Sequence, residues 1–322
     1  MEQVESLHRS CHLPFELTPG VAAYDAATSK ANAAKNFLVL AYGAPKAGKT
    51  HFAMQSQRPL YVAYLDTNPN LDTHLLKSSA EWGEEVYKLV LKPMKYEDLT
   101  QAEAQNRVQQ IEAFAASAKA YAKERRAQGL YGGTFILDGG TYLKGYYEKA
   151  ELGESSTLGY RAKKGERGGP STFDYAKSNA MLFDFIAGFA NEDLDFVAIF
   201  EGRPVYTKGV DARGVETNTK TDKWRSTRPD RVPYAVNAEI ELMKVLERQD
   251  PTNNQSALIS TPKLRVVLNS ENYAFDHMVL PAMGFQRFKE MLLAETVGDL
   301  VMVHESEVLR ANDSGLGGGD DD

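Results

Sequence analysis

Eight consecutive residues, Gly43 to Thr50, have the types and spacing of a phosphate-binding loop. They fit G-x-x-x-x-G-K-[ST], in which glycines let main-chain N–H groups close around phosphate oxygens. In this pattern the lysine reaches the β- and γ-phosphates, and the final hydroxyl lies on Mg²⁺. The sequence therefore predicts a nucleoside triphosphate site formed by Gly43, Ala44, Pro45, Lys46, Ala47, Gly48, Lys49 and Thr50.

The residues on either side of this segment have the secondary structure that the pattern requires. An apolar run of strand length, residues 37–42, comes directly before it. Residues 50–57 follow as a short helix, which Pro59 brings to an end. A strand, a glycine-rich loop and a helix in this order distinguish a phosphate-binding loop from a chance match.

A second sequence pattern, which ends in a carboxylate, predicts the residue that binds the metal ion together with Thr50. Asp138 ends the apolar run 134–138, as does the aspartate that holds Mg²⁺ beside many phosphate-binding loops. The alternative is a turn-forming aspartate before Gly139 and Gly140. We expect Thr50 and Asp138 to share the Mg²⁺ ion.

The carboxylate that would orient an attacking water must come from elsewhere, because Gly139 follows Asp138 where many ATPases have an acid. Asp66, at the end of the strand 60–66, should emerge at the same edge of the sheet. A helix cap or a turn is the alternative role for Asp66. Glu201, after the strand 195–200, has the usual place of a polar residue that senses the γ-phosphate. We expect Lys49, Asp66 and Glu201 to be catalytic.

The order of elements predicts the α/β class, with a mostly parallel sheet and helices on both faces. Two later segments alternate like edge strands and enclose a turn sequence, which predicts a β-hairpin that extends the sheet. The expected strands are 37–42, 60–66, 86–91, 134–138, 195–200, 238–246 and 263–268, and the expected helices are 50–57, 96–128, 173–190 and 285–303.

Two segments read as long loops rich in basic residues. Residues 202–233 contain eight Lys or Arg against four Asp or Glu, with aromatic residues interleaved, and residues 152–172 are similar but shorter. Cations follow phosphates and aromatic rings stack on bases, so both loops are candidate contacts for single-stranded DNA. Flexible loops whose charges only favour solvation are the alternative. The expected contacts are Arg161, Lys163, Lys164, Arg167, Arg203, Lys208, Arg213, Lys220, Lys223, Trp224, Arg225 and Arg228.

Composition limits the remaining possibilities. The net charge is −7, so any contact with nucleic acid must be local rather than a general attraction. Cys11 is the only cysteine, which suits a reducing cytoplasm. No apolar run has the length of a membrane span, and residues 1–11 do not resemble a signal peptide, so no membrane partner is expected.

The arrangement of residues 36–275 resembles the RecA-like core, most closely that of phage-encoded RecA-like ATPases linked to recombination and single-strand annealing. The resemblance rests on the loop at 43–50, on Asp66, Asp138 and Glu201, on the two basic loops, and on the two late strands. It implies ATP and Mg²⁺ as ligands, loops that face single-stranded DNA, and a filament or ring of identical subunits. Family members carry cations on the late strand that reach the neighbour's ATP; Lys263 and Arg265 match them, and Arg265 would be an arginine finger.

The chain departs from the family pattern at two places. Many phage members have Asp-x-Glu where this chain has Asp66, Thr67 and Asn68, and the strand-end sensor is often Gln or His rather than Glu201. The expected parts are a lead-in segment (1–35), a RecA-like ATPase core (36–280), a C-terminal helical segment (281–311) and a disordered acidic tail (312–322) that could recruit a DNA-metabolism protein.

The sequence thus predicts a DNA-stimulated ATPase that binds single-stranded DNA and assists recombination or strand annealing, in the host cytoplasm if a phage encodes it. Two alternatives stay open. One is an oligomeric DNA motor, such as a helicase or a packaging ATPase. The other is an assembly protein that a bound nucleotide switches, with little hydrolysis.

Overall fold

The computed structural model describes residues 36–66, 71–92, 94, 98–153, 175–210, 216–249, 255–269, 275–293 and 303–304. The chain divides into two units, Met1–Ala34 and Lys35–Asp322, and the described residues all belong to the second. The expected lead-in segment and the acidic tail therefore lie outside the described residues.

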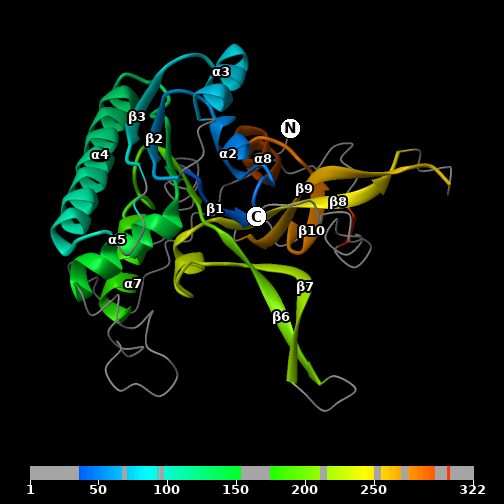
Figure 1. The fold of residues 1–322 in the computed structure, drawn as a ribbon. Coiled ribbons are helices and arrows are strands. Elements are labelled where there is room, and N and C mark those ends of the chain that lie inside the picture. The colour runs from blue at the N-terminus through cyan, green and yellow to red at the C-terminus, as the bar shows by residue number, and fades with distance from the viewer. Residues whose placement is uncertain are drawn as a thin grey trace, which may run out of the picture. The chain divides into compact units, whose positions relative to one another are not determined.

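A nine-stranded sheet forms the centre of the second unit, counted over the described ranges (Figure 1). Its order is β3-β2-β4-β5-β1-β8-β9-β10-β11; neighbours from β3 to β8 are parallel, and those from β8 to β11 are antiparallel. The strands are β1 (Leu38–Gly43), β2 (Leu60–Tyr64), β3 (Val86–Val90), β4 (Thr134–Asp138), β5 (Asp195–Ile199), β8 (Ala238–Arg248), β9 (Leu258–Asn269), β10 (Met278–Pro281) and β11 (Val303–His304).

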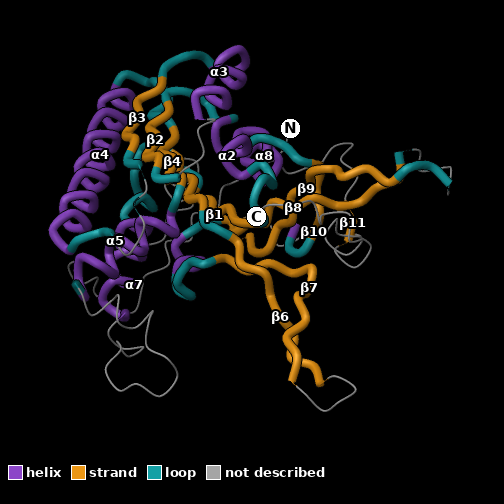
Figure 2. Tube along the Cα trace, viewed as in Figure 1, coloured by secondary structure: helices purple, strands orange, loops and turns teal. Residues whose placement is uncertain are grey.

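Helices cover both faces of this sheet (Figures 1 and 2). One core contains Leu38 and Leu40 of β1 with helices α4 (Gln101–Ala127), α5 (Gly140–Leu152) and α7 (Tyr175–Ala187). The other contains Val39 and Ala41 with α2 (Lys49–Met54), α3 (Leu71–Trp82) and α8 (Phe285–Leu293). Successive side chains of a strand point to opposite faces, so an unbroken apolar run serves both cores. The expected α/β class, with its mostly parallel sheet, is confirmed.

Two helices, α3 and α5, were not predicted from the sequence, whereas α4 was. Thr100 and Glu103 form a capping box at its start, and its buried residues Ala104, Val108, Ile111 and Ala115 recur at helical spacing. No helix of the described ranges combines the length and apolar character that crossing a bilayer requires.

The segment 202–233 is not the long loop that the sequence suggested. It forms an antiparallel hairpin of β6 (Gly202–Val210) and β7 (Glu216–Ser226), followed by a short 3₁₀ helix, Val232–Ala235. In Figures 1 and 2 the hairpin extends away from the main sheet. Threonines at alternate positions of β7 favour a strand, but a strand without apolar alternation gives no hydrophobic period to recognise.

The expected C-terminal helix does not extend to Val303. Helix α8 is described over Phe285–Leu293, and Val303, where the helix was expected to end, instead pairs with β10 together with His304. The late hairpin exists as expected, but its strands β8 and β9 are longer than the sequence indicated. An open sheet edge offers unpaired hydrogen-bonding groups, which a short segment such as β11 satisfies.

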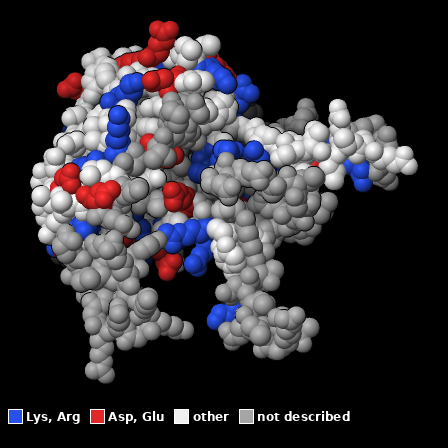
Figure 3. Space-filling view, viewed as in Figure 1, with Lys and Arg blue, Asp and Glu red and all other residues white. Residues whose placement is uncertain are grey.

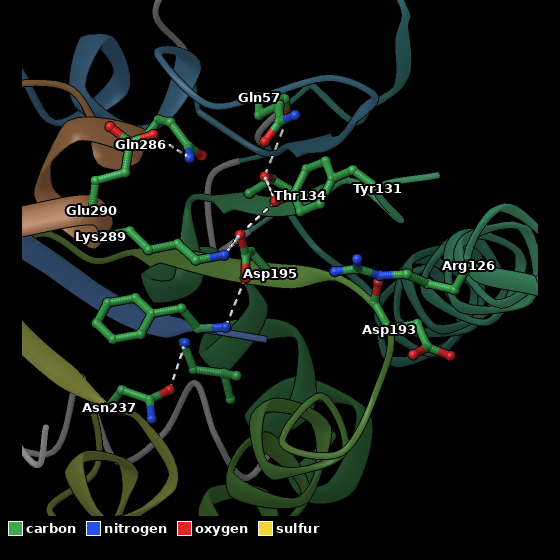
Figure 4. Close-up of polar contacts among 12 residues, drawn as sticks. Gln57, Arg126, Tyr131, Thr134, Asp193, Asp195, Asn237, Gln286, Lys289 and Glu290 are labelled. Carbon is green, nitrogen blue, oxygen red and sulfur yellow. Dashed lines mark hydrogen bonds and ion pairs between the residues drawn. The ribbon is translucent and has the colours of Figure 1, made fainter. Parts of the chain in front are cut away.

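A buried carboxylate at the amino end of β5 binds groups from α8, from the residue before β1 and from the segment before β4 (Figure 4). Asp195, fully buried at the start of β5, accepts the Phe37 N–H at 2.7 Å and pairs with Lys289 of α8 at 2.6 Å. It also accepts a hydrogen bond from the Tyr131 hydroxyl, whose pKa is raised by burial and by Asp195. Burying a charge is tolerated only where it is paired, so Lys289 fixes α8 against the sheet.

Replacing Lys289 with Met should therefore destabilise the protein. Lys289→Met leaves Asp195 buried without its cation, and we expect the free energy of unfolding to fall by about 3 kcal/mol in urea titrations.

Arg287→Met is the matched control on the same helix. Its ion pair with Glu81 is exposed, with side-chain exposures of 66% and 44%, so its removal should cost less than about 1 kcal/mol. Equal decreases in unfolding free energy in the two variants would show that the pair of Lys289 with Asp195 is not what holds α8 against the sheet.

Candidate functional site

Polar side chains from four separate segments meet at the carboxyl edge of the sheet. Lys49 and Thr50 begin α2 after β1, Asp138 ends β4, and Asp66 and Glu201 lie just after β2 and β5. Because these strands are parallel neighbours, their carboxyl ends lie at the same edge. The structure thus brings together the residues that the sequence selected as metal-binding and catalytic, except Arg265.

The loop between β1 and α2 has main-chain conformations that suit glycine. Gly43 has a φ of 142°, and a Cβ atom there would lie 2.0 Å from the Leu242 carbonyl oxygen. Gly48 caps α2 with a φ of 97°. The loop can therefore pass close to β8 and turn sharply into the helix, which a side chain at Gly43 would prevent.

The Lys49 ammonium lies back over this loop. Its Nζ atom donates to the carbonyl oxygens of Gly43 and Ala44, at 3.1 and 2.9 Å. Burial lowers the pKa of Lys49, while Asp138, Asp66 and Glu201 act in the opposite direction. All three carboxylates thus lie close enough to stabilise the ammonium.

The Thr50 hydroxyl and the Asp138 carboxylate are in direct contact. Thr50 Oγ1 donates to Asp138 Oδ2 at 2.8 Å, and Asp138 is 1% exposed. Burial raises the pKa of Asp138 to about 7; the Thr50 hydrogen bond lowers it, Asp66 raises it and Lys49 lowers it. The carboxyl therefore changes its charge near neutral pH.

These two oxygen donors suit a Mg²⁺ ion that is bound mainly through phosphate and water. Mg²⁺ commonly takes one or two protein oxygens and completes its octahedron with phosphates and waters. No group of three or more His, Cys, Asp or Glu side chains placed to hold a metal occurs among the residues that the structure describes. The donor set of Thr50 and Asp138 thus fits a magnesium–nucleotide complex rather than a metal ion bound by protein alone.

Glu201 connects this edge to the β6–β7 hairpin. The next residue, Gly202, begins β6 so close to the loop that a Cβ atom there would lie 2.7 Å from the carbonyl carbon of Gly43. The Glu201 main chain bonds to Thr141 and Thr227, two residues that the sequence analysis did not select. No motif marks them, because Thr141 after two glycines and Thr227 after Ser226 are ordinary turn residues in the sequence.

The structure places Arg265 in the interior rather than at the surface. Its guanidinium pairs with Glu241 across β8 and β9, and the side chains of the two are 11% and 0% exposed. Lys263 pairs with Glu247 at 2.7 Å. To reach a neighbouring subunit, Arg265 would have to abandon a buried carboxylate, at a cost of about 3–5 kcal/mol. This placement weighs against an arginine-finger role.

The expected DNA-contacting residues divide into three groups. Arg203, Lys208 and Arg225 are exposed on the hairpin, whereas Arg228 and Trp224 are turned inward. Arg228 makes two hydrogen bonds to the buried Glu239 carboxylate, at 3.0 and 2.8 Å, and Trp224 packs against the core. Outside the described residues, or without described side chains, are Arg161, Lys163, Lys164, Arg167, Arg213, Lys220 and Lys223.

Two of the three exposed cations, Arg203 and Arg225, lie where the hairpin joins the rest of the unit. Arg203 of β6 lies directly opposite Arg225 of β7 in the ladder, and Figure 3 shows basic side chains in this region with acidic ones nearby. Like charges on facing positions repel each other, which an anion between them would relieve. Among the described side chains, Arg203 and Arg225 are therefore the best candidates for binding an anionic ligand on the hairpin.

The raised pKa of Asp138 predicts a pH-dependent stability. The unfolded carboxyl ionises near pH 3.8 and the folded one near pH 7, so the folded state holds the extra proton between these values. Stability contributed by this group thus falls as pH rises through that window. Asp138→Asn has no carboxyl to titrate, so it should not lose this stability as pH rises. We therefore expect the difference in unfolding free energy, variant minus wild type, to be larger at pH 8 than at pH 5 by on the order of 3 kcal/mol.

Chemical denaturation of the ligand-free protein at both pH values measures this difference. Asp72→Asn is the control, because the Asp72 side chain is 78% exposed and should show no such dependence. A pH-independent effect of Asp138→Asn would mean that the carboxyl titrates normally.

Comparison of the sequence with protein families and with curated proteins provides no relative from which a role could be transferred. No model of a protein family matches the chain, and no curated protein matches its sequence.

Proposed function

We propose that this protein binds and hydrolyses ATP with Mg²⁺ and uses the nucleotide to control a contact with single-stranded DNA. One observation carries the proposal: Lys49, Thr50 and Asp138 meet at the end of a glycine loop, with Asp66 and Glu201 beside them. This set combines a cation for phosphates, two oxygens for Mg²⁺ and two further carboxylates. The RecA-like fold is part of the same proposal.

Each side chain has a distinct role in this chemistry. Lys49 would exchange its bonds to the loop carbonyls for the β- and γ-phosphate oxygens, where its charge stabilises the transferring phosphoryl group. Thr50 and Asp138 would hold Mg²⁺, which neutralises phosphate charge when it is bound. Asp66 or Glu201 would orient the attacking water.

The rate of hydrolysis separates this function from a second candidate. Gly139 rather than an acid follows Asp138, so no carboxylate adjoins the metal-binding aspartate. A protein in which the nucleotide acts as an assembly switch, with little turnover, would not need a carboxylate that orients water. Asp66→Asn and Glu201→Gln address this directly: loss of turnover in either variant supports an ATPase, and negligible turnover in the wild type favours the switch.

The DNA contact is proposed for the hairpin. Arg203 and Arg225 face each other near its root, Lys208 lies further along β6, and Tyr206 between them is 55% exposed. Cations that follow phosphates beside a ring that can stack on bases suit a single strand. The proposal also includes four expectations that follow from the family resemblance. The protein assists recombination or annealing, forms a homo-oligomeric filament or ring, recruits a partner through its tail, and is encoded by a phage and acts in the host cytoplasm. A DNA motor remains the alternative.

Removing the Lys49 charge should strongly weaken nucleotide binding. We expect Lys49→Ala to weaken the binding of a fluorescent ATP analogue with Mg²⁺ by at least about 100-fold, in line with the loss of a strong charge-assisted contact. For the wild type, affinity should increase as pH rises through about 7, because Asp138 must lose its proton before it binds Mg²⁺.

Lys88→Ala is the matched control, since Lys88 lies on the edge strand β3 in an exposed pair with Asp72. Its affinity should equal that of the wild type. Normal binding by Lys49→Ala would remove the basis of the proposed function.

Neutralising the hairpin cations should weaken DNA binding in a salt-dependent way. For the double variant Arg203→Gln and Arg225→Gln we expect lower affinity for oligodeoxythymidylate, and a plot of log affinity against log salt that is shallower by about 1.4, or 0.7 for each lost phosphate contact. Lys244→Gln, which removes an exposed cation from β8, should change neither. An unchanged slope in the double variant would place the DNA contact elsewhere.

A further inference from the structure

A closed ring of hydrogen bonds joins the turn after Asp138 to the root of the hairpin. The Glu201 N–H donates to Thr141 Oγ1 at 2.9 Å, and the Thr227 N–H donates to the Glu201 carbonyl oxygen at 3.1 Å. The Thr141 and Thr227 hydroxyls are 2.7 Å apart and close the ring. Both main-chain groups of Glu201 are thereby fixed by two threonines.

The three members of the ring come from different parts of the chain. Thr141 lies three residues after Asp138, at the start of α5; Glu201 follows β5; and Thr227 follows the last residue of β7. The Thr141 hydroxyl is thus the point at which the metal-binding strand end meets both strands of the hairpin.

The turn that carries Thr141 has little room to move independently. A Cβ atom on Gly139 would lie 2.8 Å from Leu65 Cβ, and one on Gly140 would lie 2.7 Å from the Phe200 ring. Close-packed groups shift together rather than separately. A displacement at Asp138 should therefore pass to Thr141 rather than be absorbed in the turn.

We propose that Thr141 is a positioning residue, which sets the Glu201 carboxylate opposite Lys49 and transmits the state of the triphosphate site to the β6–β7 hairpin. The inference rests on the proposed nucleotide site and adds to it the route of regulation. Two features favour this route: Glu201 acts electrostatically on Lys49, and Gly202 begins the hairpin against the Gly43 main chain. Sites coupled in this way influence each other reciprocally.

Thr141→Val tests this role, because it keeps the shape of the side chain and removes only the hydroxyl. Thr141→Ser restores the hydroxyl, and Thr227→Val opens the ring from its other side. Hydrogen exchange of the peptide that contains Glu201 is the first measurement, since the amide loses its acceptor. We expect exchange to become about 10-fold faster in Thr141→Val and to return to the wild-type rate in Thr141→Ser.

The second measurement is the effect of a non-hydrolysable ATP analogue with Mg²⁺ on affinity for oligodeoxythymidylate. We expect the analogue to change this affinity by about 10-fold in the wild type and in Thr141→Ser, but by less than about 2-fold in Thr141→Val and Thr227→Val. Affinity for the analogue in the absence of DNA should change little, because none of the altered atoms belongs to the glycine loop, Thr50 or Asp138. Thermal unfolding of each variant identifies any general loss of folding, which the serine variant should not share.

The outcomes separate this inference from the proposed function. Full coupling in a folded Thr141→Val, or a serine variant that fails to restore coupling, would overturn the positioning role while the nucleotide site stands. A wild type that binds the analogue but shows no change at the hairpin would also overturn it. A wild type that does not bind the analogue would refute the proposed function first, and this inference with it.

Discussion

The burial of the Lys49 ammonium among carboxylates is the constraint around which the rest of the site is arranged. One cation, held over the loop by two carbonyl oxygens, faces Asp138, Asp66 and Glu201. Acids outnumber the cation here, and the pKa of Asp138 is raised mainly by burial and further by the Asp66 carboxylate. A triphosphate would add further negative charge at this edge, which a metal cation beside Lys49 would offset. The arrangement therefore suits a magnesium–nucleotide complex better than a free nucleotide.

Strand order and two glycines make this concentration of charge possible. Because β1 lies between β5 and β8, the loop after β1 emerges beside the end of β5 on one side and the Leu242 carbonyl on the other. A side chain at Gly43 would collide with Leu242, and one at Gly202 would collide with the Gly43 main chain. The glycines thus let the loop at 43–50, the sheet and the root of the hairpin share one small space.

The sequence predicted the features that depend on local pattern and missed those that depend on spatial partners. The glycine loop, the apolar strands and the acid at the end of β4 are recognisable from spacing, so Lys49, Thr50 and Asp138 could be selected in advance. Arg265 and Arg228 could not be judged in the same way. A basic residue looks alike in sequence whether it faces solvent or a buried acid, and only the pairing of β8 with β9 reveals Glu241 as the partner of Arg265. The hairpin was missed because polar strands have no hydrophobic period.

The polar character of the hairpin also explains why its root has so many specific contacts. An isolated two-stranded ribbon is marginally stable in water and gains little from apolar burial of its own. Here the returning strand is fastened by the paired hydrogen bonds between Arg228 and the buried Glu239, and by the bonds of Thr227 to Glu201 and Thr141. The direction of the hairpin is therefore set at its base, where Gly202 lies against the Gly43 main chain. An arm oriented at its base turns small shifts there into larger displacements along its length, which is why the proposed control by a nucleotide is assigned to the base.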